Sequence, residues 1–166
     1  MKENADSAKQ FLEKIVVNVG VGRRSQEQNF EEKVLPQIKK DLAYIAGQAP
    51  HARRARKSIA GFKIRQGQII GLRATLRGKK MVDFFQKLIM MVLPRVRDFR
   101  GLDITSVDGG GSLNIGFKEH IVFPEIHPEE SLLSFPLQVT LVPKLKKRDR
   151  ALERYRRFGI PLKKET

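Results

Sequence analysis

Cations without carboxylates dominate the centre of the sequence. The stretch ARKSIAGFKIRQGQIIG, residues 55–71, contains four Lys or Arg side chains and three glycines but no Asp or Glu. Residues 51–100 hold 14 Lys plus Arg and two Asp, so 14 minus 2 gives a net charge of +12. Such a surface attracts polyanions, and phosphate binding is the chemistry that it predicts. The alternative is a solvated charged face.

The whole chain carries the same bias. It has 33 Lys plus Arg and 18 Asp plus Glu in 166 residues, a formal charge of +15. A partner of opposite charge relieves self-repulsion of this size. The sequence has no helix-turn-helix, zinc-finger or basic-zipper pattern, and its cations fall on predicted strands and a glycine-rich loop. Folded RNA, which is recognised by shape, is therefore favoured over DNA.

Patterns typical of enzymes are weak in this sequence. The stretch NVGVGRRS, residues 18–25, lacks the third glycine of G-x-G-x-x-G, so it indicates a strand turn near phosphates better than a nucleotide site. Asp83 and Glu119 lie among cations without a recognisable acid and base pairing. Several serines lie outside any G-x-S-x-G context: Ser58, Ser106, Ser112 and Ser131. We predict that the protein is not an enzyme.

Metal and cofactor sites are not expected either. His51, His120 and His127 are scattered, without zinc-motif spacing or an obvious carboxylate partner, so we predict surface or loop histidines. Cysteine is absent, which excludes disulfides and thiolate chemistry. Residues 1–10 are polar, and no apolar run approaches the roughly 20 residues that span a bilayer, so a soluble protein is expected.

The elements that must position the cations can be read from periodicity. Residues 14–21 are rich in β-branched residues and predict a strand that enters a tight turn. Residues 29–46 have helical apolar spacing, and Pro36 within them predicts a kink or a late helix start. Residues 51–57 predict a further strand and residues 58–68 a long loop.

Residues 69–77, IIGLRATLR, alternate between apolar and polar side chains, as a half-buried strand does. The face expected to build the core carries Leu72, Ala74 and Leu76. The opposite face, which is expected to bind, carries Arg73, Thr75 and Arg77.

The rest of the chain completes an α+β pattern. Residues 79–93 predict the main core helix, closed by Pro94, and residues 146–158 predict a basic helix. Strands are expected at residues 112–119 and 137–142. Because strands and helices are mixed irregularly, we predict an α+β fold with a mostly antiparallel sheet packed against helices. We expect one domain, residues 1–166, with an extended glycine-rich basic loop at 58–68 and a basic C-terminal helix and tail at 144–166.

Four segments together resemble the bacterial ribosomal protein L5 family. They are KIVVNVGVG (14–22), ARKSIAGFKIRQGQIIGLRATLRG (55–78), FFQKLIMMVLPRVRDFRGL (84–102) and GSLNIGFKEHIVFPEI (111–126). The resemblance implies a cytoplasmic protein of the large ribosomal subunit, without cofactor, reaction or membrane contact. It implies binding to 5S rRNA and attachment of that RNA to 23S rRNA in the central protuberance. It also implies contacts with neighbouring large-subunit proteins, the small-subunit protein S13 and the peptidyl-site tRNA.

The resemblance also assigns residue roles. The positions expected to bind 5S rRNA are Asn18, Gln48, Arg73, Thr75 and Arg77. The loop expected to face tRNA or rRNA contributes Arg56, Lys57, Ser58, Gly61, Phe62, Lys63, Arg65, Gln66 and Gly67. Its cations would hold phosphate, and its glycines would allow close backbone approach.

The ends of the sequence differ from the family pattern. Usual members have a longer amphipathic segment before the first strand, and residues 143–164 are more basic than the usual tail, which leaves rRNA contact or a solvated helix open. Two competing classes also remain: a nucleic-acid binder outside ribosomes, such as a chromatin or regulatory protein, and a phosphate-ester enzyme that uses Gly20 and Gly22.

Overall fold

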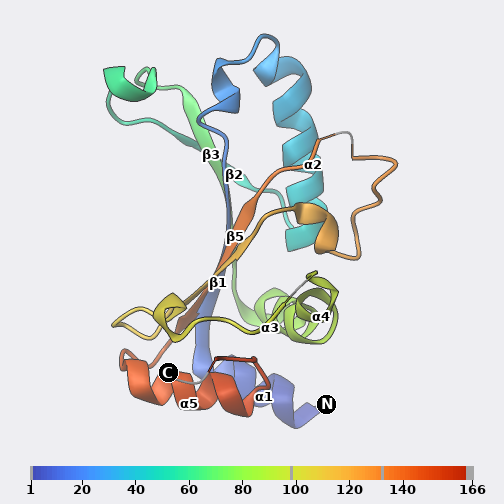
Figure 1. Cartoon of the computed structure of the whole chain (residues 1–166), viewed down its shortest axis with the longest axis vertical. Helices are drawn as coiled ribbons and strands as arrows, with labels where there is room; N and C mark the ends of the chain where they lie inside the picture. Colours follow the sequence, from blue (N-terminus) through green and yellow to red (C-terminus); the bar gives the residue numbers. More distant parts are fainter. Residues whose placement is uncertain (1, 98, 132, 164–166) are drawn as a thin grey trace.

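A single antiparallel sheet organises the chain. The computed structural model describes residues 2–97, 99–131 and 133–163. Its five strands lie in the order β2-β3-β1-β5-β4, and every neighbouring pair is antiparallel (Figure 1). Their bounds are β1 Leu12–Gly20, β2 His51–Arg54, β3 Ile69–Leu76, β4 Leu113–Phe117 and β5 Leu137–Pro143. Together with the helices, this confirms the predicted α+β class and the antiparallel sheet.

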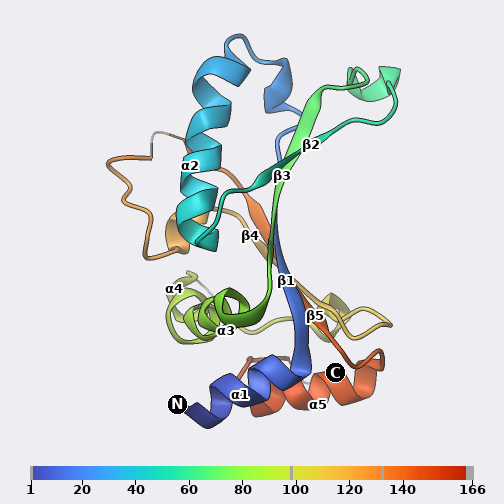
Figure 2. The ribbon, with the colours of Figure 1, turned by 180° about the vertical axis from the view of Figure 1, so that it is seen from behind.

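Helices cover one face of the sheet and one end of the molecule. α2 (Leu35–Ala46), α3 (Gly78–Lys87) and α4 (Leu93–Arg95) lie on the same side of the strands in both views (Figures 1 and 2). α1 (Lys2–Phe11) and α5 (Arg148–Arg157) lie side by side at the lower end, where both termini are found. The other sheet face carries no helix longer than a single turn among the described residues.

The central strand shows why the sheet has one dry face. In β1, Ile15, Val17 and Val19 are fully buried, whereas Asn18 between them is exposed. Successive side chains of a strand point to opposite faces, so this alternation sends the apolar set under the helices and the polar set outward. The expected alternation of β3 is confirmed in the same way, since Leu72, Ala74 and Leu76 are buried.

Two π-helical turns change the predicted helix bounds. They span Phe30–Val34 and Leu88–Val92, and each is followed directly by Leu-Pro. Pro36 therefore lies at the start of α2, as the late-start alternative predicted. The prediction that Pro94 closes the core helix was wrong, because helical structure continues to Arg95. A proline lacks the N–H that would bond four residues back, and a wider turn just before it accommodates that missing bond.

Further differences concern short or amphipathic elements. α1 has no counterpart in the sequence prediction, yet Ala8 and Phe11 are buried and attach it to the core. β2 ends at Arg54 instead of residue 57. Single 3-10 turns lie at Arg24–Gln26, Ala60–Phe62, Ile104–Ser106 and His120–Val122. None of the described helices combines the length and apolar character needed to cross a membrane.

Candidate nucleic-acid interface

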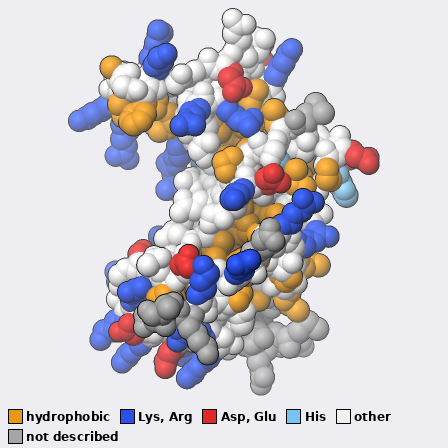
Figure 3. Space-filling model, in the orientation of Figure 1, with side chains coloured by type: hydrophobic (Ala, Val, Ile, Leu, Met, Phe, Trp, Pro, Cys, Tyr) orange, Lys and Arg blue, Asp and Glu red, His pale blue; other side chains and the backbone are white. Residues whose placement is uncertain are grey.

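The helix-free face of the sheet forms a polar surface that crosses all five strands. The register places His51 of β2 opposite Arg73 of β3, and Arg73 opposite Asn18 of β1. Asn18 in turn pairs with Gln138 of β5, which lies opposite Gly116 of β4. These five residues form one row on one face, which we call the polar row. On the side away from α2 the molecule is hollowed and mostly white, showing polar side chains and backbone (Figure 3).

A second row lies beside the polar row. Val16 of β1 is flanked by Thr75 of β3 and Thr140 of β5, and Thr140 is paired with Asn114 of β4. The Thr140 hydroxyl donates to Asn114 Oδ1 at 2.8 Å. Val16, Thr75, Thr140 and Asn114 all have short side chains, and the row lies on the same face of the sheet as the polar row.

The structure brings together three of the five residues predicted for 5S rRNA. Asn18 and Arg73 are exposed neighbours in the polar row, and Thr75 lies half-buried in the second row. Arg77 lies just beyond β3 in extended backbone, and its guanidinium is 3.6 Å from Glu13. Lys14, through a hydrogen bond and its charge, and then Arg77 lower the pKa of the Glu13 carboxyl.

Gln48 is held differently from the other four. It follows α2, and its side-chain amide donates to the Thr75 carbonyl at 2.9 Å. Pairing between β2 and β3 ends at Arg73. The Gln48 amide therefore supplies a hydrogen-bond donor to a β3 carbonyl that lies beyond the end of β2. The structure therefore gives Gln48 an internal role at the edge of β3, and RNA contact by Gln48 stays a prediction.

Sequence reasoning missed half of this surface. Gln138, Thr140 and Asn114 come from two strands that were predicted, but their outward residues were not singled out. The same alternation that identified Arg73 would have identified them. Gly20 and Gly116 have no side chain, so bare backbone extends the surface at these two positions. The space above them is open, since a Cβ placed on either residue would meet nothing within 4 Å.

The segment between β2 and β3, residues 55–68, forms a projecting arm at the upper end of the sheet (Figure 1). Backbone pairing continues into it, since Ala55 N–H donates to the Gln68 carbonyl at 2.8 Å. Ile59 and Ile64 pair across it, and the Ser58 hydroxyl accepts a bond from Gln66 N–H at 2.9 Å. The predicted long loop is thus an arm with internal backbone and side-chain hydrogen bonds.

The turn that follows β1 braces the arm. Gln26 donates to the Phe62 carbonyl at 2.9 Å, and Gln68 donates to the Ser25 hydroxyl at 2.8 Å. The stretch NVGVGRRS, considered above as a nucleotide site or a strand turn, contains the end of β1 and a turn whose Ser25 accepts hydrogen bonds from Gln68 at the base of the arm.

The arm presents cations beside an exposed aromatic ring. All nine residues predicted for this site are exposed. In the described part of the chain, no carboxylate lies within ion-pair distance of its four cations, Arg56, Lys57, Lys63 and Arg65. Phe62 is 70% exposed. Unpaired cations bind phosphate, and an exposed ring offers a stacking surface for an unpaired base.

One histidine prediction was wrong. His120 was expected to be a surface or loop residue without an obvious carboxylate partner, but it is fully buried. Its Nε2 lies 2.9 Å from the Ser131 hydroxyl and 3.4 Å from Asp41 Oδ2, and that hydroxyl donates to Asp41 Oδ2 at 2.9 Å. Burial lowers the pKa of His120, against the opposing effect of the Asp41 charge. Because Asp41 and Ser131 are 90 positions apart in the sequence, local pattern could not reveal this cluster.

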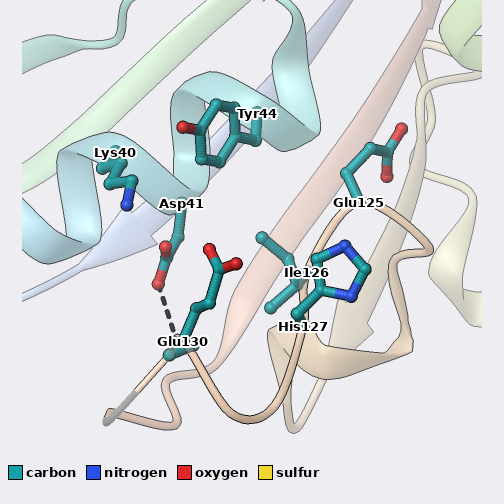
Figure 4. A pocket seen from close by; sticks show the side chains of 8 residues that line it. Lys40, Asp41, Tyr44, Glu125, Ile126, His127 and Glu130 are labelled. Atoms are coloured by element: carbon teal, nitrogen blue, oxygen red, sulfur yellow. Dashed lines mark hydrogen bonds between the residues drawn. The ribbon is translucent and has the colours of Figure 1, made fainter.

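This buried cluster connects segments that are distant in the sequence. It ties α2 to the segment that precedes β5, and the His120 ring stacks on Phe135 with centroids 3.9 Å apart. Beside it lies a cavity of about 10 Å³, room for one water, onto which Lys40, Asp41 and the 125–131 segment face (Figure 4). Within residues 2–97, 99–131 and 133–163, no group of three or more His, Asp or Glu side chains is arranged to hold a metal.

Comparison with known proteins gives a consistent relationship along the chain. Residues 9–65 match the family model described as "Ribosomal protein L5", and residues 69–162 match the model of the C-terminus of the same ribosomal protein family. Among curated proteins, one from Wigglesworthia glossinidia brevipalpis is 45% identical over 92% of this chain and 84% of its own length. One from Halothermothrix orenii is 43% identical over 90% and 82%, and one from Thermotoga maritima 45% over 92% and 81%. All three are named "Large ribosomal subunit protein uL5".

Proposed function

Because the chain belongs to the ribosomal protein L5 family and is a non-enzymatic component of the large ribosomal subunit, we propose that it binds 5S rRNA through the helix-free face of its sheet. The polar row carries this proposal. It aligns a guanidinium, two amides and open glycine backbone on one face that no long helix covers. Amides and hydroxyls fixed on strands can match the shape and 2′-hydroxyls of a folded RNA, while cations supply affinity for phosphate.

The arm performs a second task in this proposal. Its cations and Phe62 meet RNA at a distance from the polar row, and peptidyl-site tRNA is the partner that the family resemblance suggests. Attachment of 5S rRNA to 23S rRNA in the central protuberance, and contact with S13, belong to the same proposal. The arm and the basic C-terminal segment are then projections of one RNA-binding domain.

Two double variants separate the roles of sheet and arm. The sheet variant combines Asn18→Ala with Arg73→Ala and changes the charge by one unit. The arm variant combines Lys63→Glu with Arg65→Glu and changes it by four units, because each reversal counts twice. If charge alone governed 5S rRNA binding, the arm variant would be the weaker binder.

We expect the opposite order. In filter binding at fixed salt, the sheet variant should lose most affinity for 5S rRNA and the arm variant should stay close to the unmodified protein. Duplex DNA of equal length serves as the control ligand and should bind much more weakly than 5S rRNA. Equal affinity for the two nucleic acids, or a greater loss in the arm variant with circular dichroism unchanged, would refute the assignment.

A further inference from the structure

α5 carries a row of arginines that the proposed sheet and arm sites do not use. Arg150, Arg154 and Arg157 are spaced i, i+4, i+7, and all three are exposed. At 3.6 residues per turn they fall within roughly 60° of one another around the helix, and their attachment points span about 10 Å along it. We call these three residues the basic row. Lys146 and Lys147, also exposed, continue it before the helix begins.

The basic row makes no close ion pair with the described part of the protein. The two carboxylates of α5, Asp149 and Glu153, are spaced to lie on the neighbouring stripe of the helix together with Arg156. Within the described residues, none of the ion pairs closer than 4.0 Å involves the basic row. Blue side chains accordingly gather over the lower end of the molecule, with fewer red ones among them (Figure 3).

Another side of α5 is fixed to the core. Ala151 and Tyr155 are fully buried, and the Tyr155 hydroxyl donates to the Gly111 carbonyl at 2.9 Å. The Phe11 ring packs edge-on against Tyr155 with centroids 5.2 Å apart. Because the helix cannot turn or detach without breaking these contacts, the Cα positions from which its arginines project are fixed relative to the core. Arginines spaced on a fixed helix bind backbone phosphates at a lower entropic cost than the same residues on a flexible basic tail.

The position of α5 separates it from the other proposed RNA contacts. α5 lies at the lower end of the sheet and the arm projects from the upper end (Figure 1). α5 therefore lies at the other end of the sheet from the arm (Figures 1 and 2). We propose that the basic row binds the phosphate backbone of a second RNA segment, one that belongs to the large-subunit rRNA and not to 5S rRNA.

This inference rests on the proposed function, so its test must separate the two. The row variant combines Arg150→Gln, Arg154→Gln and Arg157→Gln. The matched control combines Lys33→Gln, in the turn before α2, with Lys39→Gln and Lys40→Gln on α2, so that both variants remove three exposed charges. Each protein is titrated with 5S rRNA alone. Each is then titrated with a large-subunit rRNA transcript that lacks 5S rRNA, both as free protein and as its 5S complex, over a range of salt.

We expect the row variant to bind 5S rRNA like the control, within about twofold. Its affinity for the large-subunit transcript should fall at least about tenfold, and the slope of log affinity against log salt should shrink by roughly 2 to 3, at about 0.7–0.9 for each of three phosphate contacts. Equal transcript affinity and slope in row variant and control would overturn the inference. Failure of every protein to bind 5S rRNA would instead refute the proposed function, and the free-protein titration would still decide the role of the basic row.

Discussion

Phe62 is unusual at the scale of single residues, because a large apolar ring stands mostly in solvent among cations. Gln26 donates a hydrogen bond to the backbone carbonyl of Phe62, so the backbone that carries the ring is held in place. Phe62→Ala should weaken binding to tRNA by about 1–3 kcal/mol, the usual value of one base stacked on an aromatic side chain. Fluorescence anisotropy with labelled tRNA measures this.

A matched control distinguishes stacking from general loss of surface. Phe62→Trp keeps an aromatic face and should bind tRNA as well as the unmodified protein. Thermal unfolding should be the same in both variants, since the ring packs against little of the protein. Wild-type affinity in the alanine variant would show that the ring does not contact RNA.

We expect His120 to make the free energy of unfolding depend on pH. Burial lowers its pKa in the folded protein below the ordinary value of 6.5, so the unfolded chain binds a proton first as the pH falls. The free energy of unfolding should therefore decrease below about pH 6.5, until the pH reaches the lower folded-state pKa. Urea unfolding between pH 7.5 and 5.5 measures the slope.

The variant His120→Gln keeps a hydrogen-bonding side chain but cannot gain this charge. It should be less stable overall and should show a smaller decrease between the two pH values. If the two proteins lose stability in parallel as the pH falls, the pH dependence arises from other groups.

At the scale of elements, one glycine fixes the position of α5. Gly111 has φ +84, and a Cβ there would lie 2.9 Å from the Cβ of Ala151. Gly111→Ala should therefore cost about 1–3 kcal/mol from backbone strain, with the steric clash in addition. A fall of several degrees in Tm is expected in differential scanning calorimetry.

The neighbouring Gly109 provides the control for this prediction. A Cβ at Gly109 would meet nothing within 4 Å, so Gly109→Ala should leave Tm nearly unchanged. A neutral Gly111→Ala variant would mean that α5 can shift without loss. In that case the conclusion that packing fixes the position of α5 and its basic row would lose its support.

At the scale of the whole molecule, net charge should govern how affinity depends on salt. The formal charge is +15, and unpaired cations lie on the arm and the sheet face. If four of them contact phosphates, log affinity for 5S rRNA should fall with log salt with a slope of about 3, at roughly 0.7–0.9 per contact. Filter binding from low to high salt measures it, and a nearly flat dependence would contradict electrostatic docking.

Local patterns in the sequence were sufficient to predict the core face of β3, the exposed cations of the arm and the family. Alternation in residues 69–77 predicted which side chains of β3 face the core, because a strand sends successive side chains to opposite faces wherever it is placed. The cationic run predicted the exposed surface of the arm, since isolated charges stay in water. The quoted segments were sufficient to indicate the family, which the comparisons then established.

Strand register and the burial of polar side chains depend on residues that are distant in the sequence, so only the tertiary structure revealed them. Register set Asn18 between Arg73 and Gln138, and strand pairing of this kind cannot be read from any one strand. Packing buried His120 against Asp41, although local sequence suggested a surface residue. A strand or helix carries its own periodicity, but which face meets which partner is decided only when the elements pack together.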